Sequence, residues 1–213
     1  MTCVSIDLRL KTGPVRDQGA RPTCLAFATS DAHAAGRVVA YEPLSPEYLF
    51  YHARRRSTPF NPHAGATLSQ LVDALRDDGQ PIEADWPYLA NLPIDLSSYV
   101  PPAPVSCFRA GFRLLPLTVA AAQNELLLGL PPVLVFWQTL AFVEAGPDQD
   151  IDERPSDSSL GLHAVVIVRI DGTAGLQRIQ IKNSWGTDWG DGGYAWMTAK
   201  YFARTASALL GMS

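Results

Sequence analysis

The sequence predicts an α+β protein in which a mainly helical first half precedes a β-rich second half. The first half of the 213-residue chain contains three segments with apolar residues at helical spacing. The second half contains four short runs of β-branched or aromatic residues, bounded by Gly, Pro, Asn or Asp. A proline-rich stretch from residue 93 to 104 separates the two halves. Because 47% of the residues are hydrophobic, the chain can bury the core of one domain or of two closely packed lobes.

Three helices are predicted in the first half. The segment from 24 to 40 lacks proline and repeats apolar residues at helical spacing, so the first helix is expected to begin near Cys24. Residues 45–47 (Ser-Pro-Glu) supply a cap, a proline for the first helical position and an acid for the first turn of a second helix of about ten residues. The third helix carries an apolar stripe from Leu68 to Leu75 and is ended by Gly79.

Four strands and one further helix are predicted in the second half. The strands cover residues 132–137, 163–170, 176–181 and 193–197. The helix runs from about Thr118 to Leu128, with Gly129 after it. The sequence contains no internal repeat.

Charge and hydropathy exclude two classes of partner. The net charge is −4, and no stripe of Lys and Arg alternates with aromatic residues, so nucleic acid is not an expected partner. No stretch reaches the roughly 18 apolar residues of a membrane span, and the N-terminus lacks the pattern of a signal peptide. We therefore expect no membrane association.

The cysteines do not form a disulfide or metal pattern. Cys3, Cys24 and Cys107 are an odd number at wide spacings, and together with the four histidines they show no paired ligand spacing. No metal and no cofactor is therefore expected. At least one thiol must stay free, which favours a reducing compartment.

Cys24 is the candidate nucleophile. A helix N-terminus favours the thiolate and can lower a cysteine pKa to ~3.5–7.5, and Cys24 falls at the predicted start of the first helix. The alternative, a buried structural cysteine, is equally compatible with the cysteine alone.

His163, Asn183 and Gln18 are the candidate partners of this thiol. His163 opens an apolar strand after a polar loop, whereas His33 lies about 180° around the first helix from Cys24. Asn183 can accept a hydrogen bond from a histidine and thereby fix its tautomer. Gln18, six residues before Cys24, can donate its amide N–H to an oxyanion. Each residue also has an ordinary structural interpretation.

Together these segments resemble the papain-like cysteine peptidases. The resemblance is carried by GPVRDQGARPTCLAF, GLHAVVIV and IKNSWGTDWGDGGY, which match the nucleophile, histidine and asparagine blocks in that order. His163 and Asn183 follow Cys24 by 139 and 159 residues, close to the family's spacing of roughly 130–150. Further similarity in LSPEYLFY and around residues 65–88 extends the resemblance over nearly the whole chain.

The resemblance implies a papain-like two-lobe fold. One domain, 1–213, is expected, with a helical lobe over about 18–92 and a β-barrel-like lobe over about 105–200. The N-terminal segment 1–17 is expected to cross between the lobes, and the active site to lie in the cleft.

The resemblance also assigns residues to the substrate site. Substrate backbone is expected to pair with the main chain near Gly65 and with the carbonyl of Leu162. Trp185 is assigned to the substrate site together with Gly65 and Leu162. Its ring is also expected to shield the hydrogen bond between His163 and Asn183 from water.

Three departures from the family pattern change the surroundings of Cys24. Residues 21–23 (Arg-Pro-Thr) replace a usual second cysteine, so the usual disulfide is absent. Leu25 replaces an aromatic residue, and the cysteine- and glycine-containing block before the third helix is reduced to residues 63–66. These departures bear on the shape of the substrate groove and leave the catalytic residues in place.

The expected function is that of a cysteine endopeptidase acting through a thiolate–imidazolium pair and an acyl-enzyme. The chain resembles a bacterial-type member without prosegment or disulfides, since only 17 residues precede Gln18. We therefore expect cytoplasmic cleavage of a narrow set of proteins, with an inhibitor or regulatory protein as a further partner. Two alternatives stay open: a catalytically silent binding protein, and an acyl transferase that uses the same site.

The segment from 144 to 161 is expected to form a charged loop next to His163. It holds six acids and one arginine. It either serves as a solvated connection or forms an acidic rim that favours basic substrates.

Overall fold

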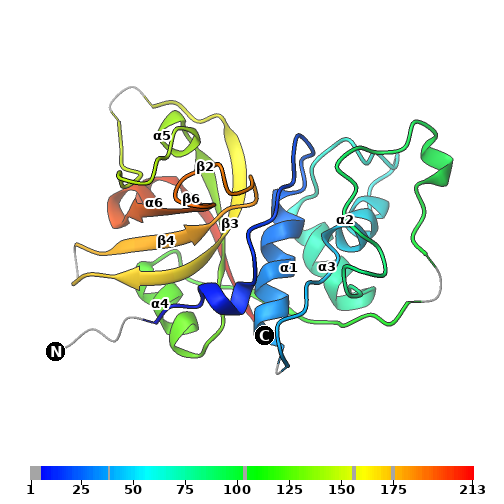
Figure 1. The fold of residues 1–213 in the computed structure, drawn as a ribbon, viewed down its shortest axis with the longest axis horizontal. Coiled ribbons are helices and arrows are strands. Elements are labelled where there is room, and N and C mark those ends of the chain that lie inside the picture. Colours follow the sequence, from blue (N-terminus) through cyan, green and yellow to red (C-terminus); the bar gives the residue numbers. More distant parts are fainter. Residues whose placement is uncertain (1–5, 38, 103–104, 155–156, 174–175) are drawn as a thin grey trace.

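The computed structural model describes residues 6–37, 39–102, 105–154, 157–173 and 176–213. Its helices are η1 (Arg9–Thr12), α1 (Cys24–Gly36), α2 (Pro46–Arg55), α3 (Leu68–Asp77), η2 (Leu96–Ser98), α4 (Val119–Leu127), α5 (Leu140–Val143) and α6 (Ala199–Thr205). Its strands are β1 (Phe112–Leu114), β2 (Val133–Gln138), β3 (Gly161–Asp171), β4 (Arg178–Lys182), β5 (Tyr194–Thr198) and β6 (Ala206–Met212). Helices α1–α3 gather on one side of the molecule and the sheet on the other, which confirms the α+β class (Figure 1).

The predicted helix starts agree with the structure. Helix α1 begins at Cys24. The Ser45 hydroxyl accepts a hydrogen bond from the Tyr48 N–H and so caps α2, which carries Pro46 in its first turn. Helix α1 ends at Gly36, where Arg37 takes an extended conformation.

A capping box begins α3 and a glycine follows its end. The Thr67 side chain accepts from the Gln70 N–H, while the Gln70 side chain accepts from the Thr67 N–H. Gly79 has a φ of +74° and donates its N–H to the Ala74 carbonyl, 2.9 Å away.

Six strands of the described chain form one antiparallel sheet in the order β1-β6-β2-β3-β4-β5. The four predicted strands correspond to β2, β3, β4 and β5. Strands β1 and β6 were not predicted. Strand β6 has the sequence ASALLGM, whose Ala, Ser and Gly residues are weak strand formers, and it is stabilised by pairing with β2 and β1 on its two sides.

Helix α1 joins the two halves of the molecule. Ala28 and Ala32 of α1 are buried against Val166 of β3 and Leu210 of β6. The small alanine side chains let the helix lie close to the sheet, which also brings Cys24, at the start of α1, toward the beginning of β3. A separate apolar cluster packs α1 against α2 and α3. None of the described helices is long and apolar enough to cross a membrane.

Buried charges reinforce this junction. Arg16 contacts Asp31 of α1 and Glu83 of the helical half, each at 2.5 Å. Lys182 of β4, whose side chain is fully buried, contacts the second Asp31 oxygen at 2.8 Å. This chain of ion pairs connects the N-terminal segment, α1 and the strand that leads into Asn183.

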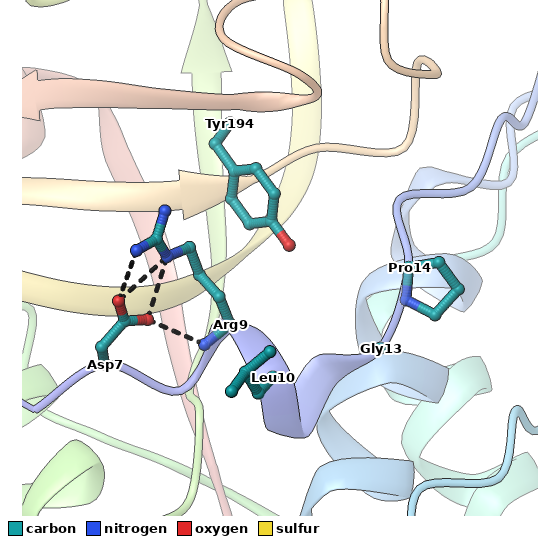
Figure 2. Close-up of a pocket in the computed structure, with 6 residues that line it drawn as sticks. All are labelled: Asp7, Arg9, Leu10, Gly13, Pro14 and Tyr194. Atoms are coloured by element: carbon teal, nitrogen blue, oxygen red, sulfur yellow. Dashed lines mark hydrogen bonds and ion pairs between the residues drawn. The ribbon is translucent and has the colours of Figure 1, made fainter.

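The N-terminal segment runs along the sheet. Leu8 donates its N–H to the Val168 carbonyl of β3 at 2.9 Å, and Asp7 holds the Arg9 guanidinium through two oxygens. Asp7 and Arg9, with Tyr194 of β5, line an open cavity of about 690 Å³ (Figure 2). The cavity contains none of the predicted site residues.

His33 is expected to make the stability of the fold depend on pH. The side chain is 3% exposed, and burial, with a smaller effect of Arg37, lowers its pKa from 6.5 to about 4. Between these values the unfolded chain binds more protons than the folded one. The stability that depends on neutral His33 is therefore fully present above about pH 6.5. It is lost, and the free energy of unfolding falls, as the pH is lowered toward 4.

The variant His33→Gln should show a smaller loss of stability on acidification. Between pH 7.5 and 4.5 the free energy of unfolding of the wild type should fall by about 2–3 kcal/mol more than that of the variant. Urea unfolding at the two pH values measures this difference. His163 titrates equally in both proteins, so its contribution cancels in the comparison. Equal losses in the two proteins would show that His33 does not titrate in this way.

Candidate active site

A cavity of about 440 Å³ lies between the start of α1 and the start of β3. Four of the predicted site residues line it: Cys24, His163, Gly65 and Leu162. Its other lining residues are mainly apolar and come from α1, α3, β2, β3 and β6: Pro22, Leu25, Ala66, Thr67, Leu68, Val135, Ala164, Ser207 and Ala208. Asn183, Gln18 and Trp185 do not line the cavity and lie behind or beside its walls.

His163 and Asn183 are hydrogen bonded inside the protein. The distance from His163 Nε2 to Asn183 Oδ1 is 2.8 Å, and both residues are at most 4% exposed. The Ser184 N–H also donates to Asn183 Oδ1 at 2.8 Å, which fixes that oxygen as an acceptor. Nε2 must therefore carry the proton, and in the neutral imidazole Nδ1 is the basic atom.

Aromatic rings enclose this hydrogen bond. The Trp185 ring centroid is 4.8 Å from that of His163, and the Phe142 centroid is 5.2 Å from both. Trp189 donates its Nε1–H to the Phe142 carbonyl at 3.2 Å and completes the cluster. Phe142 was not predicted from the sequence, because an apolar residue in a short helix carries no signal of proximity to a histidine 21 positions later.

Burial favours the neutral forms of both catalytic candidates. It raises the pKa of the Cys24 thiol, although the backbone N–H groups of Ala164, Leu25 and Cys24 act in the opposite direction. It lowers the pKa of His163 to about 4, against a smaller opposing effect of Asn183. The expected depression of the thiol pKa is therefore absent, because loss of solvation outweighs the helix N-terminus.

Gln18 is anchored at both ends of its side-chain amide. Its Nε2 donates to the Arg21 carbonyl at 2.7 Å, and its Oε1 accepts from the Ser184 hydroxyl at 2.7 Å. Because an amide nitrogen carries two hydrogens, one N–H remains available for another acceptor. Ser184, which the sequence analysis did not single out, thus contacts Gln18 through its side chain and Asn183 through its backbone.

Gly65 lies opposite the loop that precedes Cys24. A Cβ added to Gly65 would lie 3.8 Å from Pro22, an ordinary contact distance. The Gly65 carbonyl accepts a hydrogen bond from the Arg54 guanidinium at 2.9 Å, so this oxygen is already used within the protein. The Gly65 N–H is therefore the group at this position to consider for substrate pairing.

The acids of the loop from 144 to 161 form ion pairs within the sheet-bearing half. Glu144 pairs with Arg154, Asp150 with Arg178 and Glu153 with Lys200, at 2.6, 3.1 and 2.9 Å. Outside positions 155 and 156, which the structure does not describe, none of the loop residues lines the cavity at Cys24. These contacts favour the interpretation of the segment as a connection over that of an acidic rim. In the described part of the chain no group of three or more His, Cys, Asp or Glu residues is placed to hold a metal ion.

Comparison with known proteins gives one family match and several similar structures. The family model described as papain family cysteine protease matches residues 150–208. Cathepsin K of Gallus gallus is 27% identical over 203 residues, which cover 89% of this chain and 57% of that protein. Falcipain-3 of Plasmodium falciparum is 26% identical over 221 residues, which cover 90% of this chain and 40% of that protein. The chain thus spans about half the length of the curated relatives it matches.

The similar structures share the fold over almost the full chain. Xylellain, a cysteine protease from Xylella fastidiosa, superimposes with a TM-score of 0.79 at 22% identity and covers 98% of this chain and 85% of its own. The bromelain protease from Ananas comosus, in complex with the E64 inhibitor, gives a TM-score of 0.76 at 20% identity over 100% and 99% of the two chains. The helical part and the antiparallel sheet therefore have the same relative arrangement in all three.

Proposed function

We propose that the chain is a papain-family cysteine protease, as the family match over residues 150–208 and the similar proteins support, and that it hydrolyses peptide bonds with Cys24 as nucleophile. His163 is the general base in this proposal and Asn183 its orienting partner. The observation that carries the proposal is the buried hydrogen bond from His163 Nε2 to Asn183 Oδ1, on a histidine that shares a cavity with Cys24. A hydrogen-bonded imidazole beside a thiol is the arrangement that activates a cysteine for acyl transfer.

The first half of the reaction forms an acyl-enzyme. The Cys24 thiol transfers its proton to Nδ1 of His163, and the sulfur attacks the substrate carbonyl carbon. The carbonyl electrons move to the oxygen, which becomes an oxyanion that the Gln18 amide and the Cys24 backbone N–H can stabilise. When the oxyanion collapses, the peptide C–N bond breaks and the imidazolium donates its proton to the departing amine.

The second half of the reaction releases the acid product. Neutral His163 takes a proton from water, whose oxygen attacks the thioester. Collapse of the second tetrahedral intermediate expels the Cys24 sulfur, and the proton on His163 returns to it. Asn183 keeps Nε2 protonated throughout, so that Nδ1 alone accepts and returns the proton.

Burial of both groups couples the two charges in this mechanism. A thiolate alone or an imidazolium alone is disfavoured at this site, as the raised pKa of Cys24 and the lowered pKa of His163 indicate. Transfer of one proton between them creates both charges together, and each stabilises the other in a poorly solvated environment. The aromatic cluster around His163 keeps competing water away from the imidazolium.

The lining of the cavity supports a substrate with an apolar side chain close to the cleaved bond. Leu68, Val135 and Ala208 form apolar walls, and Thr67 and Ser207 supply the hydroxyl groups. Apart from Cys24 and His163, none of its lining residues is ionisable. The apolar lining disfavours a charged substrate side chain, which would lose its solvation without gaining a counter-ion.

Cleavage of internal bonds, a narrow substrate range, cytoplasmic action and control by a regulatory protein stay predictions. Protein or peptide substrates follow from the family. The free thiols of Cys24 and Cys107 are compatible with a reducing compartment.

Labelling with a thiol-directed epoxide tests the proposed function. We expect one adduct, on Cys24, because of the two cysteines that the structure describes it is the one with a histidine in its cavity. We expect hydrolysis of a peptide library to stop as the adduct forms. Cys107, whose thiol donates to the Val105 carbonyl at 3.8 Å and also interacts with the Tyr48 side chain, serves as the internal control. Peptide mapping by mass spectrometry locates the adduct.

The labelling result also separates the alternatives. No selective adduct and no hydrolysis would favour the catalytically silent binding protein. An adduct on Cys24 together with transfer of the acyl group to an added amine, in place of hydrolysis, would favour the acyl transferase.

A further inference from the structure

We infer that Glu47 is a positioning residue for the oxyanion donor Gln18 and acts on it through Arg21. The inference rests on the proposed function, because it concerns how one donor of the oxyanion site is held. It assigns a role in the reaction to a fully buried carboxylate on α2 that does not line the catalytic cavity.

The Gln18 amide has two anchors, and one of them is a backbone carbonyl. Its Nε2 donates to the Arg21 carbonyl at 2.7 Å, and the N–H of Thr23 donates to the same oxygen at 2.8 Å. The residue next to Thr23 is Cys24. The Arg21 carbonyl therefore connects the proposed oxyanion donor to the residue immediately before the nucleophile.

The Arg21 side chain fixes this carbonyl by a bidentate ion pair. Its two terminal nitrogens contact the two oxygens of Glu47 at 2.5 and 2.9 Å, and one of them also donates to the Leu89 carbonyl at 2.5 Å. The guanidinium lies over the rings of Phe50 and Tyr88, with centroid distances of 5.5 and 5.1 Å. Arg21 is 8% exposed, so water cannot readily replace Glu47 as its partner.

Glu47 has its hydrogen-bonding capacity filled by this arrangement. Besides Arg21, it accepts the N–H of Leu89 at 3.0 Å and the hydroxyl of Tyr99. Helix α2 is packed into the helical core through Leu49 and Phe50, so the carboxylate occupies a rigid position. The loop from 18 to 23 is thus held to α2 by a charged contact, at the place where the family resemblance implies a cysteine.

Tyr88 strengthens the same connection from a second side. Its hydroxyl donates to the Gln18 carbonyl at 2.7 Å and lies 2.9 Å from the Thr23 hydroxyl. The Tyr88 and Arg21 side chains therefore both hold this loop, and Arg21 is the residue whose own carbonyl receives the Gln18 amide. Catalytic donors must be held within about 0.5 Å of the productive geometry, and the Arg21–Glu47 pair supplies that constraint for Gln18.

A double-mutant cycle distinguishes this role from a purely structural one. The variant Glu47→Gln keeps the size of the side chain but leaves Arg21 without its counter-ion. We expect kcat to fall about tenfold with a smaller change in KM, since a misplaced oxyanion donor acts on the transition state. Gln18→Ala alone should lower kcat by ~10²–10³. In the Gln18→Ala background, Glu47→Gln should change kcat by less than twofold, because the group that it positions is gone.

Two controls accompany the cycle. Glu125→Gln removes a matched buried carboxylate, which pairs with Arg113 at 2.7 Å on the far side of the sheet, and should lower the melting temperature without changing kcat. Alkylation of Cys24 by iodoacetamide forms no oxyanion, so its rate in Glu47→Gln should stay within twofold of the wild type. If Glu47→Gln does not fold, Arg21→Lys, which keeps the charge but loses the bidentate contact, replaces it in the same cycle.

The outcomes separate this inference from the proposed function. Equal losses of kcat in the two backgrounds, an unchanged kcat in Glu47→Gln, or a parallel fall in the alkylation rate would each overturn the positioning role. A wild type that cannot hydrolyse peptides, or a Gln18→Ala variant with normal turnover, would refute the proposed mechanism and this inference with it.

Discussion

Cys24→Ala is expected to abolish peptide hydrolysis and leave the fold intact. In the proposed mechanism the sulfur forms the covalent intermediate, and no other group of the cavity can replace it. Loss of a nucleophile in a comparable acyl-transfer site costs ~10⁶ in kcat. Cys24 is partly exposed at the N-terminal end of α1, so its truncation removes little buried surface. The melting temperature should therefore change by only a few degrees.

Cys107→Ala is the matched control for this variant. Cys107 is also a partly buried free cysteine, but it does not line the cavity that contains His163. It should retain wild-type turnover of a fluorogenic peptide. Substantial residual hydrolysis by Cys24→Ala, measured after active-site titration excludes contamination, would remove Cys24 from the role of nucleophile.

His163→Ala is expected to have the next largest effect. Removal of the general base should lower kcat by ~10⁴. Asn183→Ala should cost less, because the imidazole remains, but its Nε2 loses the acceptor that fixes the tautomer. The order of the three losses, with Asn183→Ala the smallest, is the expected result of steady-state kinetics at a pH where each variant is folded.

Added imidazole provides a further test of the base. The cavity left by His163→Ala should admit imidazole and recover part of the lost rate, whereas Asn183→Ala should not respond. His52→Gln, at a histidine paired with Asp78 away from the cavity, should behave as the wild type. If His163→Ala turned over at more than a few per cent of the wild-type rate, another group would have to accept the thiol proton.

The sequence predicted those features that depend on neighbouring residues. The caps at Ser45 and Gly79 and the start of α1 at Cys24 follow from local backbone chemistry. The partnership of His163 and Asn183 could be predicted only because a family resemblance brought distant segments together. Strand β6 was missed, since its weak intrinsic preference is overruled by pairing with β2 and β1.

Features that depend on burial could not be predicted in this way. The start of a helix is visible in the sequence and favours a thiolate, but the loss of solvation that raises the pKa of Cys24 arises from the packed cavity. Arg21 and Glu47 are 26 residues apart, and neither carries a local sign of its partner. Phe142 similarly becomes a neighbour of His163 only when α5 packs against β3.

The position of β6 has a consequence for the moment at which activity can first appear. Residues 206–212 occupy a place between β2 and β1, so a nascent chain that already contains Cys24, His163 and Asn183 still has a gap in its sheet. Ser207 and Ala208 of this strand also line the cavity beside the thiol. A chain emerging from the ribosome therefore lacks one wall of this cavity until residues 206–212 have been made, so the order of synthesis completes the cavity only after all the proposed catalytic residues are present.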